Sequence, residues 1–151
     1  MISKFFQDCI RKQKYGLAIY PSDLFDLRIQ EEMIRADEHR SYFVYAEMFF
    51  SAVKDALVEN EEEAFWDAVL RAFATNGRGS DVMGLLENES GIGIILHDSQ
   101  MVGWNRLLGR FREFVKNSIA DVEKPLGTAK AFVYPMHINT QVPAKDPEEL
   151  Q

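Results

Sequence analysis

The sequence has almost no cysteine: Cys9 is the only one among 151 residues. A single cysteine cannot form an internal disulfide or a cysteine-based metal site, which suits a reducing compartment. The three histidines, at positions 39, 97 and 137, do not have the close spacing of a metal-binding pair. The sequence therefore predicts neither a disulfide framework nor a metal site built from histidine and cysteine.

Long apolar segments and excess positive charge are also missing. Lys4, Asp8 and Arg11 interrupt the N-terminal hydrophobic residues, which excludes a signal-peptide core or a membrane-spanning helix there. The formal net charge of the chain is −7. Because affinity for nucleic acid depends mainly on lysine and arginine, an acidic chain is a poor candidate for binding that polymer. We expect a cytoplasmic protein that neither binds nucleic acid nor inserts into a membrane.

Short apolar runs and helical stretches alternate along the rest of the chain. Four runs rich in branched and aromatic residues predict strands near residues 42–49, 82–87, 91–96 and 129–135. A helical pattern of apolar residues separates the first two strands, interrupted by the acidic stretch at residues 59–63. A second helical pattern separates the last two strands. The order strand, helix, strand, strand, helix, strand is typical of ferredoxin-like folds. The sequence therefore predicts an α+β domain of the βαββαβ type, with one antiparallel sheet, packed helices and extra N-terminal helices.

The N-terminal region adds these further helices. Residues 2–14 suit a short helix and residues 15–21 a connection or a brief strand, followed by a helix that Ser22 or Asp23 caps. The apolar residues of that helix are Leu24, Phe25, Leu27, Ile29, Met33 and Ile34. We expect residues 1–21 to be an N-terminal helix or linker, residues 22–138 the domain and residues 139–151 a loosely ordered tail.

The C-terminal half has two further local signals. Asp98 or Ser99 is a candidate cap for a helix with Met101 on its buried side, and Pro125 is expected to break the chain before the last strand. His97, Asp98 and Ser99 are adjacent, whereas a hydrolytic triad needs side chains from separate elements. We interpret these three residues as a strand end followed by a helix cap.

A longer constellation carries more information. Arg78, Gly79, Ser80 and Asp81 stand five residues ahead of the connection at residues 87–91, which joins two apolar runs. In this spacing the sequence resembles the GGDEF family, the diguanylate cyclases of bacterial signalling, whose RxxD motif lies five residues before a Gly-Gly-Asp/Glu-Glu-Phe turn. The segment EEMIRADEHR at residues 31–40 and the run from Gly109 to Arg112 resemble family patterns as well. The resemblance covers residues 22–135.

The signature turn departs from the family pattern. Glu87 and Asn88 stand where the family has the glycines that let the backbone approach nucleotide phosphates. Ser90 occupies the position of the family's catalytic acidic residue, and Gly91 occupies the position of the phenylalanine that ends the family's turn. The guanine-recognition stretch has no match either. The resemblance therefore implies a domain of this fold that is not an enzyme.

Two glutamates align with the family's metal-binding side chains. Glu47 and Glu89 correspond to the residues that hold Mg²⁺ in active members, and two carboxylates can hold Mg²⁺ together with substrate phosphates. The alternative is that both glutamates face solvent at the sheet edge. They are weak metal candidates, and we expect no resident cofactor.

The RxxD motif is retained in register. In the family this motif binds the product cyclic di-GMP, so the resemblance assigns Arg78 and Asp81 to a ligand site, with Arg110 in a supporting position. An arginine engages phosphate or guanine, and a carboxylate accepts guanine N–H groups. The alternative is a turn in which Ser80 and Asp81 bond to nearby backbone.

Three functions follow from these interpretations. The first is a catalytically inactive receptor for cyclic di-GMP that reports to a protein partner. The second is a nucleotide-free interaction or dimerisation module, which an apolar surface around Phe5, Phe6 and Tyr15, or on the outer side of residues 24–34, would favour. The third is a residual enzyme that uses Glu47 and Glu89 on another phosphorylated substrate.

Overall fold

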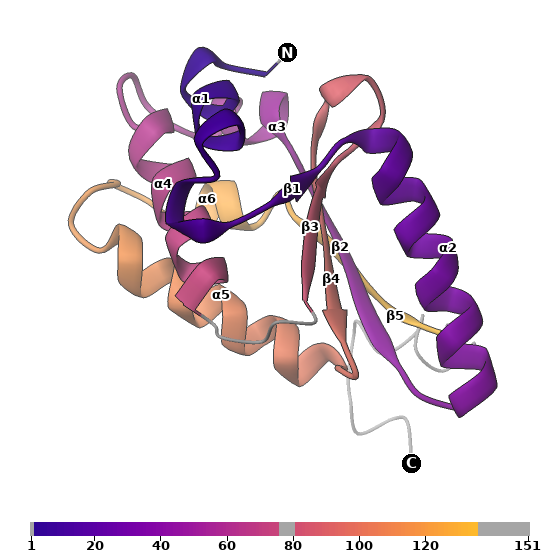
Figure 1. The fold of residues 1–151 in the computed structure, drawn as a ribbon. Helices are drawn as coiled ribbons and strands as arrows, with labels where there is room; N and C mark the ends of the chain where they lie inside the picture. Colours follow the sequence, from indigo (N-terminus) through magenta and orange to yellow (C-terminus); the bar gives the residue numbers. More distant parts are fainter. Residues whose placement is uncertain (1, 76–80, 136–151) are drawn as a thin grey trace.

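A computed structural model describes residues 2–75 and 81–135 (Figure 1). Its centre is a five-stranded sheet in the order β1-β3-β4-β2-β5. The strands are β1 (Ile19–Tyr20), β2 (Phe43–Phe49), β3 (Val82–Leu85), β4 (Gly91–His97) and β5 (Lys130–Tyr134). The four strands predicted from the sequence are confirmed within one or two residues at each end.

The four predicted strands form an antiparallel sheet, as expected, and β1 adds a parallel strand at one edge, so the whole sheet is mixed. β1 pairs parallel to β3, with Ile19 opposite Met83 and Tyr20 opposite Gly84. The other three pairings, β3 with β4, β4 with β2 and β2 with β5, are antiparallel. A strand of two residues is too short to show the alternation by which strands are recognised in a sequence.

Helices cover both faces of the sheet (Figure 1). One face carries α1 (Lys4–Lys12), α3 (Phe50–Asp55), α4 (Glu62–Thr75), α5 (Met101–Val115) and α6 (Glu123–Leu126). The other face carries α2 (Ser22–His39) alone. Two 3-10 turns, η1 (Lys14–Gly16) and η2 (Glu87–Glu89), complete the described elements. Within the described residues no helix is both long and apolar enough to cross a bilayer.

The larger core lies under the group of five helices. Val44, Ala46 and Met48 alternate along β2 toward this side, as the period of two in a strand requires. The ring of Phe6 in α1 is fully buried and lies 5.0 Å from the Phe50 ring and 5.5 Å from the Trp66 ring, centroid to centroid. α1 therefore packs onto the same core as the rest of the domain.

α2 approaches the sheet very closely through Phe25. A Cβ atom on Gly84 of β3 or Gly93 of β4 would overlap the Phe25 ring, so the two glycines make room for it. The helix begins at Ser22, after Pro21, and neither Ser22 nor Asp23 is its cap. It ends at His39, five residues beyond Ile34, the last apolar residue named for it in the sequence.

The apolar residues of α2 do not share one side. Phe25 is fully buried and Ile29 packs against it, whereas Leu24, Leu27 and Ile34 lie at the surface. The inner side is instead completed by Ala36 and by a charged residue, Glu32. Composition alone gives no sign that a glutamate lies on the buried side.

Two local predictions about the C-terminal half are wrong. Gln100 precedes α5, so Asp98 and Ser99 do not cap it, and Met101 is exposed. Pro125, expected to break the chain before the last strand, lies inside the short helix α6, which Gly127 follows. Near the start of a helix the backbone N–H has no intrahelical partner, so proline is tolerated there.

Candidate functional site

Asp81 lies directly before β3 and contacts the end of β4. Its Oδ1 atom accepts a hydrogen bond of 2.9 Å from the backbone N–H of His97. This contact ties the beginning of one strand to the end of its antiparallel neighbour, because Val82 pairs with Ile95. This hydrogen bond helps to fix the orientation of the Asp81 carboxylate.

A cavity of about 460 Å³ opens beside Asp81. It lies where the connection leading into β1, the C-terminal end of α4 and the beginning of β3 meet. Three aromatic residues contribute to its wall, and its lining comprises Tyr15, Gly16, Leu17, Ala18, Tyr20, Phe73, Ala74, Asp81, Val82 and Met83. A space of this size with an acidic residue and aromatic rings falls in the range of small-molecule sites.

Tyr15 is held in the cavity wall by Asp67 of α4. The Tyr15 hydroxyl donates a hydrogen bond of 2.7 Å to Asp67 Oδ1, and Lys14 Nζ lies 2.9 Å from the same oxygen. Arg71 contacts the other oxygen at 2.7 Å. Burial raises the pKa of Asp67, but the hydrogen bonds from Tyr15, Lys14 and Arg71 outweigh it and lower the pKa to about 2. These contacts fix the turn that precedes β1.

The other two predicted ligand residues do not lie on the described part of the cavity wall. Arg78 is outside the described residues, as are Gly79 and Ser80. Arg110 lies on α5 and is not among the lining residues. Its Nε atom is buried and has no hydrogen-bond partner within the part of the chain that the structure describes. The structure therefore places one of the three residues, Asp81, at the cavity.

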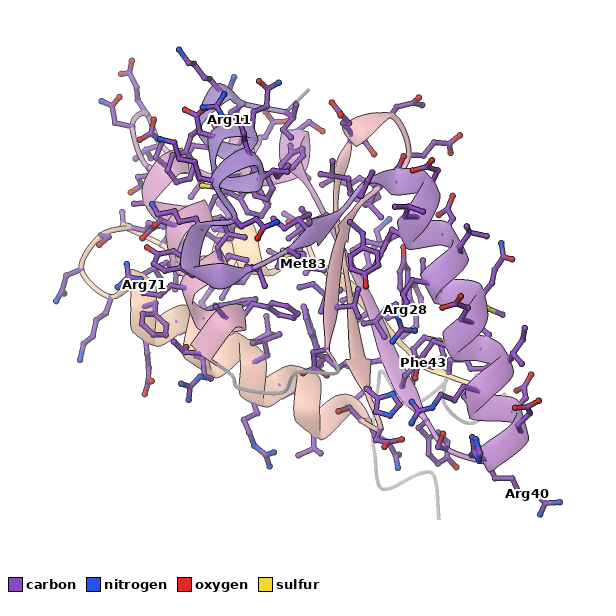
Figure 2. All side chains as sticks on the ribbon, in the orientation of Figure 1. Arg11, Arg28, Arg40, Phe43, Arg71 and Met83 are labelled. Carbon is purple, nitrogen blue, oxygen red and sulfur yellow. The ribbon has the colours of Figure 1, made fainter. Side chains whose placement is uncertain are left out.

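A buried polar cluster joins α2 to the end of β4, beside Asp81. Glu32 is only 1% exposed. Its Oε1 atom accepts from Arg28 at 3.0 Å and its Oε2 atom lies 2.6 Å from His97 Nδ1 and 3.5 Å from Arg35. Arg35 also contacts the His97 ring. Arg28 points from α2 toward the sheet in Figure 2.

The charge of Glu32 is stabilised by its partners. Burial acts to raise the pKa of Glu32, but hydrogen bonds from Arg28 and His97 and the charges of these groups lower it below its ordinary value. A buried carboxylate needs such partners, because an unpaired one is very costly. The side chain of Glu32 is therefore negatively charged, and its contacts with His97 hold α2 against the sheet.

Sequence reasoning missed this cluster. Glu32 and Arg35 belong to the segment EEMIRADEHR, which resembles the family pattern without indicating a role for either residue. Their spacing of three residues places both on one side of a helix, which is the available signal. Nothing in the sequence indicates that His97, 65 positions from Glu32, is the partner.

The turn between β3 and β4 is closed by its own residues. Asn88 and Glu89 have φ angles of 58° and 55°, in the left-handed region that glycine adopts without steric cost. Ser90 Oγ donates to the Glu87 carbonyl at 2.8 Å. Gly91 lies so close to Met48 that a Cβ atom would collide with the Met48 carbonyl oxygen. This contact explains a glycine at the position where the family has phenylalanine.

The two weak metal candidates lie on different elements. Glu47, in β2, is opposite Gly93 of β4, and its Oε2 atom accepts a 2.8 Å hydrogen bond from the Tyr45 hydroxyl. Burial and this glutamate raise the pKa of Tyr45. Glu89 lies in η2, where it is exposed. Among residues 2–75 and 81–135 no three acidic, histidine or cysteine side chains gather as a metal site would require.

Comparison with known proteins rests on structure. No family model matches the chain and no curated protein matches its sequence. A DGC protein from Thermotoga maritima superimposes with a TM-score of 0.55 at 13% identity, covering 91% of this chain and 96% of that one. The GGDEF domain of YfiN from Pseudomonas aeruginosa superimposes with a TM-score of 0.53 at 13% identity, over 78% and 77% of the two chains.

The chain has the GGDEF fold. A further structure with this fold is the diguanylate cyclase SiaD of Pseudomonas aeruginosa in complex with its activator SiaC, with a TM-score of 0.50 and 19% identity. The superposition covers 90% of this chain and 54% of SiaD, so the chain spans about half the length of that protein. The fold predicted from the sequence, a nucleotidyl-cyclase-like α+β domain, is confirmed, with the mixed sheet as the correction.

Proposed function

We propose that this GGDEF-fold domain is a non-catalytic receptor that binds cyclic di-GMP through Arg78 and Asp81, with Arg110 in support. The observation that carries the proposal is the position of Asp81 on the wall of a cavity of about 460 Å³. Asp81 is also the residue that the RxxD spacing selects. The resemblance and the cavity thus lead to the same carboxylate from independent starting points.

The cavity offers the contacts that a purine base needs. The His97 N–H orients the carboxylate of Asp81. In the proposed complex this carboxylate accepts hydrogen bonds from guanine N–H groups. Tyr15, Tyr20 and Phe73 supply aromatic rings in the wall, and stacking of a base on such a ring stabilises binding by about 1–3 kcal/mol. Arg78 would supply the positive charge for phosphate. Because the chain is acidic, the affinity depends on these few local contacts.

Two features support the absence of catalysis. Ser90, at the position of the catalytic acid, uses its hydroxyl in a hydrogen bond to the Glu87 carbonyl. The turn carries the side chains of Glu87 and Asn88 in place of two glycines, which limits the approach of nucleotide phosphates to the backbone. Loss of both positioning and electrostatic stabilisation removes most of a rate enhancement.

A second candidate, the interaction module, has its own supporting observation. Of the surface predicted around Phe5, Phe6 and Tyr15, Phe6 is buried and only Tyr15 is exposed. The outer side of α2 exposes Leu24, Leu27 and Ile34. SiaD, a protein of the same fold, was solved in complex with its activator protein. A receptor needs a surface that reports its state, so protein docking is compatible with nucleotide binding. The residual-enzyme hypothesis has no comparable observation in its favour.

Isothermal titration calorimetry with cyclic di-GMP tests the proposal. We expect saturable binding that Arg78→Ala weakens at least tenfold, since a charge-assisted hydrogen bond contributes about 1.5–3 kcal/mol. Asp81→Asn should also weaken binding, while Asp121→Asn, a change of the same kind at an exposed site, should not. Absence of heat near 100 micromolar ligand, which corresponds to about −5.5 kcal/mol, contradicts the receptor proposal. Binding that Arg78→Ala leaves unchanged contradicts it equally, and circular dichroism confirms that each variant is folded.

A further inference from the structure

α2 has a second apolar side, directed away from the sheet. Leu24, Leu27 and Ile34 are 50%, 55% and 59% exposed, whereas Phe25, Glu32 and Ala36 on the inner side are buried. Spacings of three and seven residues place Leu24, Leu27 and Ile34 along one side of a helix. We define the outer seam of α2 as Leu24, Leu27, Glu31, Ile34 and Glu38. Large aliphatic side chains aligned on an exposed helix mark an interaction surface more often than single ones do.

We infer that the outer seam of α2 docks a basic amphipathic helix of a partner protein. The spacing of the seam, three and four residues in alternation, is that of a helix that packs lengthwise against another helix. α2 has 18 residues, so it presents about 27 Å of length to such a partner. This inference does not depend on nucleotide binding.

The charge of the seam determines the kind of partner. Glu31 and Glu38 lie within it, Asp23 lies beside it, and all three are exposed. Arg28 and Arg35 both pair with the buried Glu32, Arg28 with most of its side chain covered and Arg35 with half of its side chain exposed. Asp23, Glu31 and Glu38 thus outnumber the exposed Arg35, whose charge is already paired with Glu32. The outer side offers apolar contacts with an excess of negative charge, which a helix with leucine-like residues and flanking lysine or arginine complements.

A second copy of the chain does not fit the same surface. Glu31 is the central residue of the seam, midway between Leu24 and Glu38. In a parallel or a centred antiparallel pair of seams, Glu31 therefore faces Glu31 of the other copy, and like charges at the middle of an apolar contact oppose association. Residues 136–151 are also unsuited as an occupant, because Lys145 is their only lysine or arginine and they contain three acidic residues, Asp146, Glu148 and Glu149.

Binding of designed peptides to the full chain tests the inference. The probe is a synthetic amphipathic helix of about three heptads with leucine on its apolar side and lysine or arginine on both flanks. Its counterpart carries glutamate in place of every lysine and arginine. Fluorescence anisotropy of the labelled peptides should show binding of the basic probe and much weaker binding of the acidic one.

Variants of the seam distinguish specific docking from attraction to an acidic protein. Leu27→Ser and Ile34→Ser should each weaken the basic probe about tenfold or more, since each removes the burial of a large aliphatic side chain. Val102→Ser, at a residue that is 66% exposed on α5, is the matched control and should have no effect. Glu31→Lys should weaken the binding of the basic peptide and strengthen the binding of its acidic counterpart.

Several outcomes overturn the inference. Equal binding of the two peptides, or binding that Leu27→Ser and Ile34→Ser leave unchanged, shows that the seam is not the docking site. A dimer in sedimentation velocity that Leu27→Ser dissociates assigns the seam to a second copy instead. The seam residues are outside the core, so the variants should unfold at the same urea concentration as the wild type. None of these results bears on cyclic di-GMP binding.

Discussion

Glu32 Oε2 lies 2.6 Å from His97 Nδ1, and this buried contact joins the middle of α2 to the end of β4. The same histidine donates its backbone N–H to Asp81. His97 of β4 therefore contacts both α2, the helix that carries the outer seam, and Asp81, the carboxylate on the cavity wall. Because α2 has few other large buried residues besides Phe25, the charged cluster contributes a substantial part of its attachment.

Replacement of Glu32 by alanine should destabilise the fold strongly. Removing one partner of a buried charged group leaves the others without compensation, which typically costs about 3–5 kcal/mol. We expect the free energy of unfolding, measured by urea denaturation, to fall by about that amount. Glu31→Ala, one residue away on the exposed side, is the control and should change it by less than about 0.5 kcal/mol. Equal effects of the two substitutions would show that Glu32 does not hold α2.

Acid should weaken the fold through Asp67. Its folded pKa, about 2, lies below the ordinary value of 3.8, so the unfolded chain binds the proton more readily. The contribution to stability is therefore complete above about pH 4 and is lost as the pH falls toward 2. We expect the free energy of unfolding to decrease across this window, by an amount on the order of 2 kcal/mol for this residue.

Asp67→Asn separates this contribution from that of other carboxylates. The variant should be less stable than the wild type at pH 6 and should lose less stability on acidification to pH 2.5. Lys14, Tyr15 and Arg71 remain in place, so the variant loses the charge and the hydrogen bonds accepted by one of the two Asp67 oxygens. Asp121→Asn, at an exposed position, should lose as much stability between pH 6 and pH 2.5 as the wild type does. A pH profile of Asp67→Asn that parallels the wild type contradicts the prediction.

Two glycine substitutions should have opposite effects. In Gly84→Ala the added methyl group overlaps the Phe25 ring, and overpacking of this kind costs about 1–3 kcal/mol. In Gly109→Ala the methyl group meets nothing within 4 Å, and α5 gains about 0.5–1 kcal/mol from the better helix propensity of alanine. Thermal unfolding should therefore show a lower Tm for the first variant and a higher Tm for the second. A Tm of Gly84→Ala at or above that of the wild type would contradict the close contact between Gly84 and Phe25, and a lower Tm of Gly109→Ala would contradict the open space at Gly109.

The sequence predicts the strands well because their apolar runs are bounded by strong turn residues. The run from Phe43 to Phe49 has no competing helical pattern, and the spacing from Asp81 to the turn at residues 87–91 supports both the fold and one residue of the site. The sequence leaves β1 open between a connection and a brief strand, and it gives no sign of the parallel pairing with β3, because two residues carry no periodicity. The partner of Glu32 could not be predicted either, because a contact between residues 65 positions apart depends on the assembled fold.

The last prediction is that the protein does not make cyclic di-GMP from GTP. Its turn between β3 and β4 carries Glu87, Asn88, Glu89 and Ser90, and the serine hydroxyl bonds to the turn itself. Without glycines to admit phosphates and without an acid at Ser90, positioning and charge stabilisation are both lost, which commonly removes several orders of magnitude in rate. Chromatography after incubation with GTP and Mg²⁺ or Mn²⁺ should show product at the level of a protein-free sample, beside an active diguanylate cyclase as the positive control. Product whose formation Glu89→Ala abolishes would prove the prediction wrong and would assign Glu89 to a working metal site.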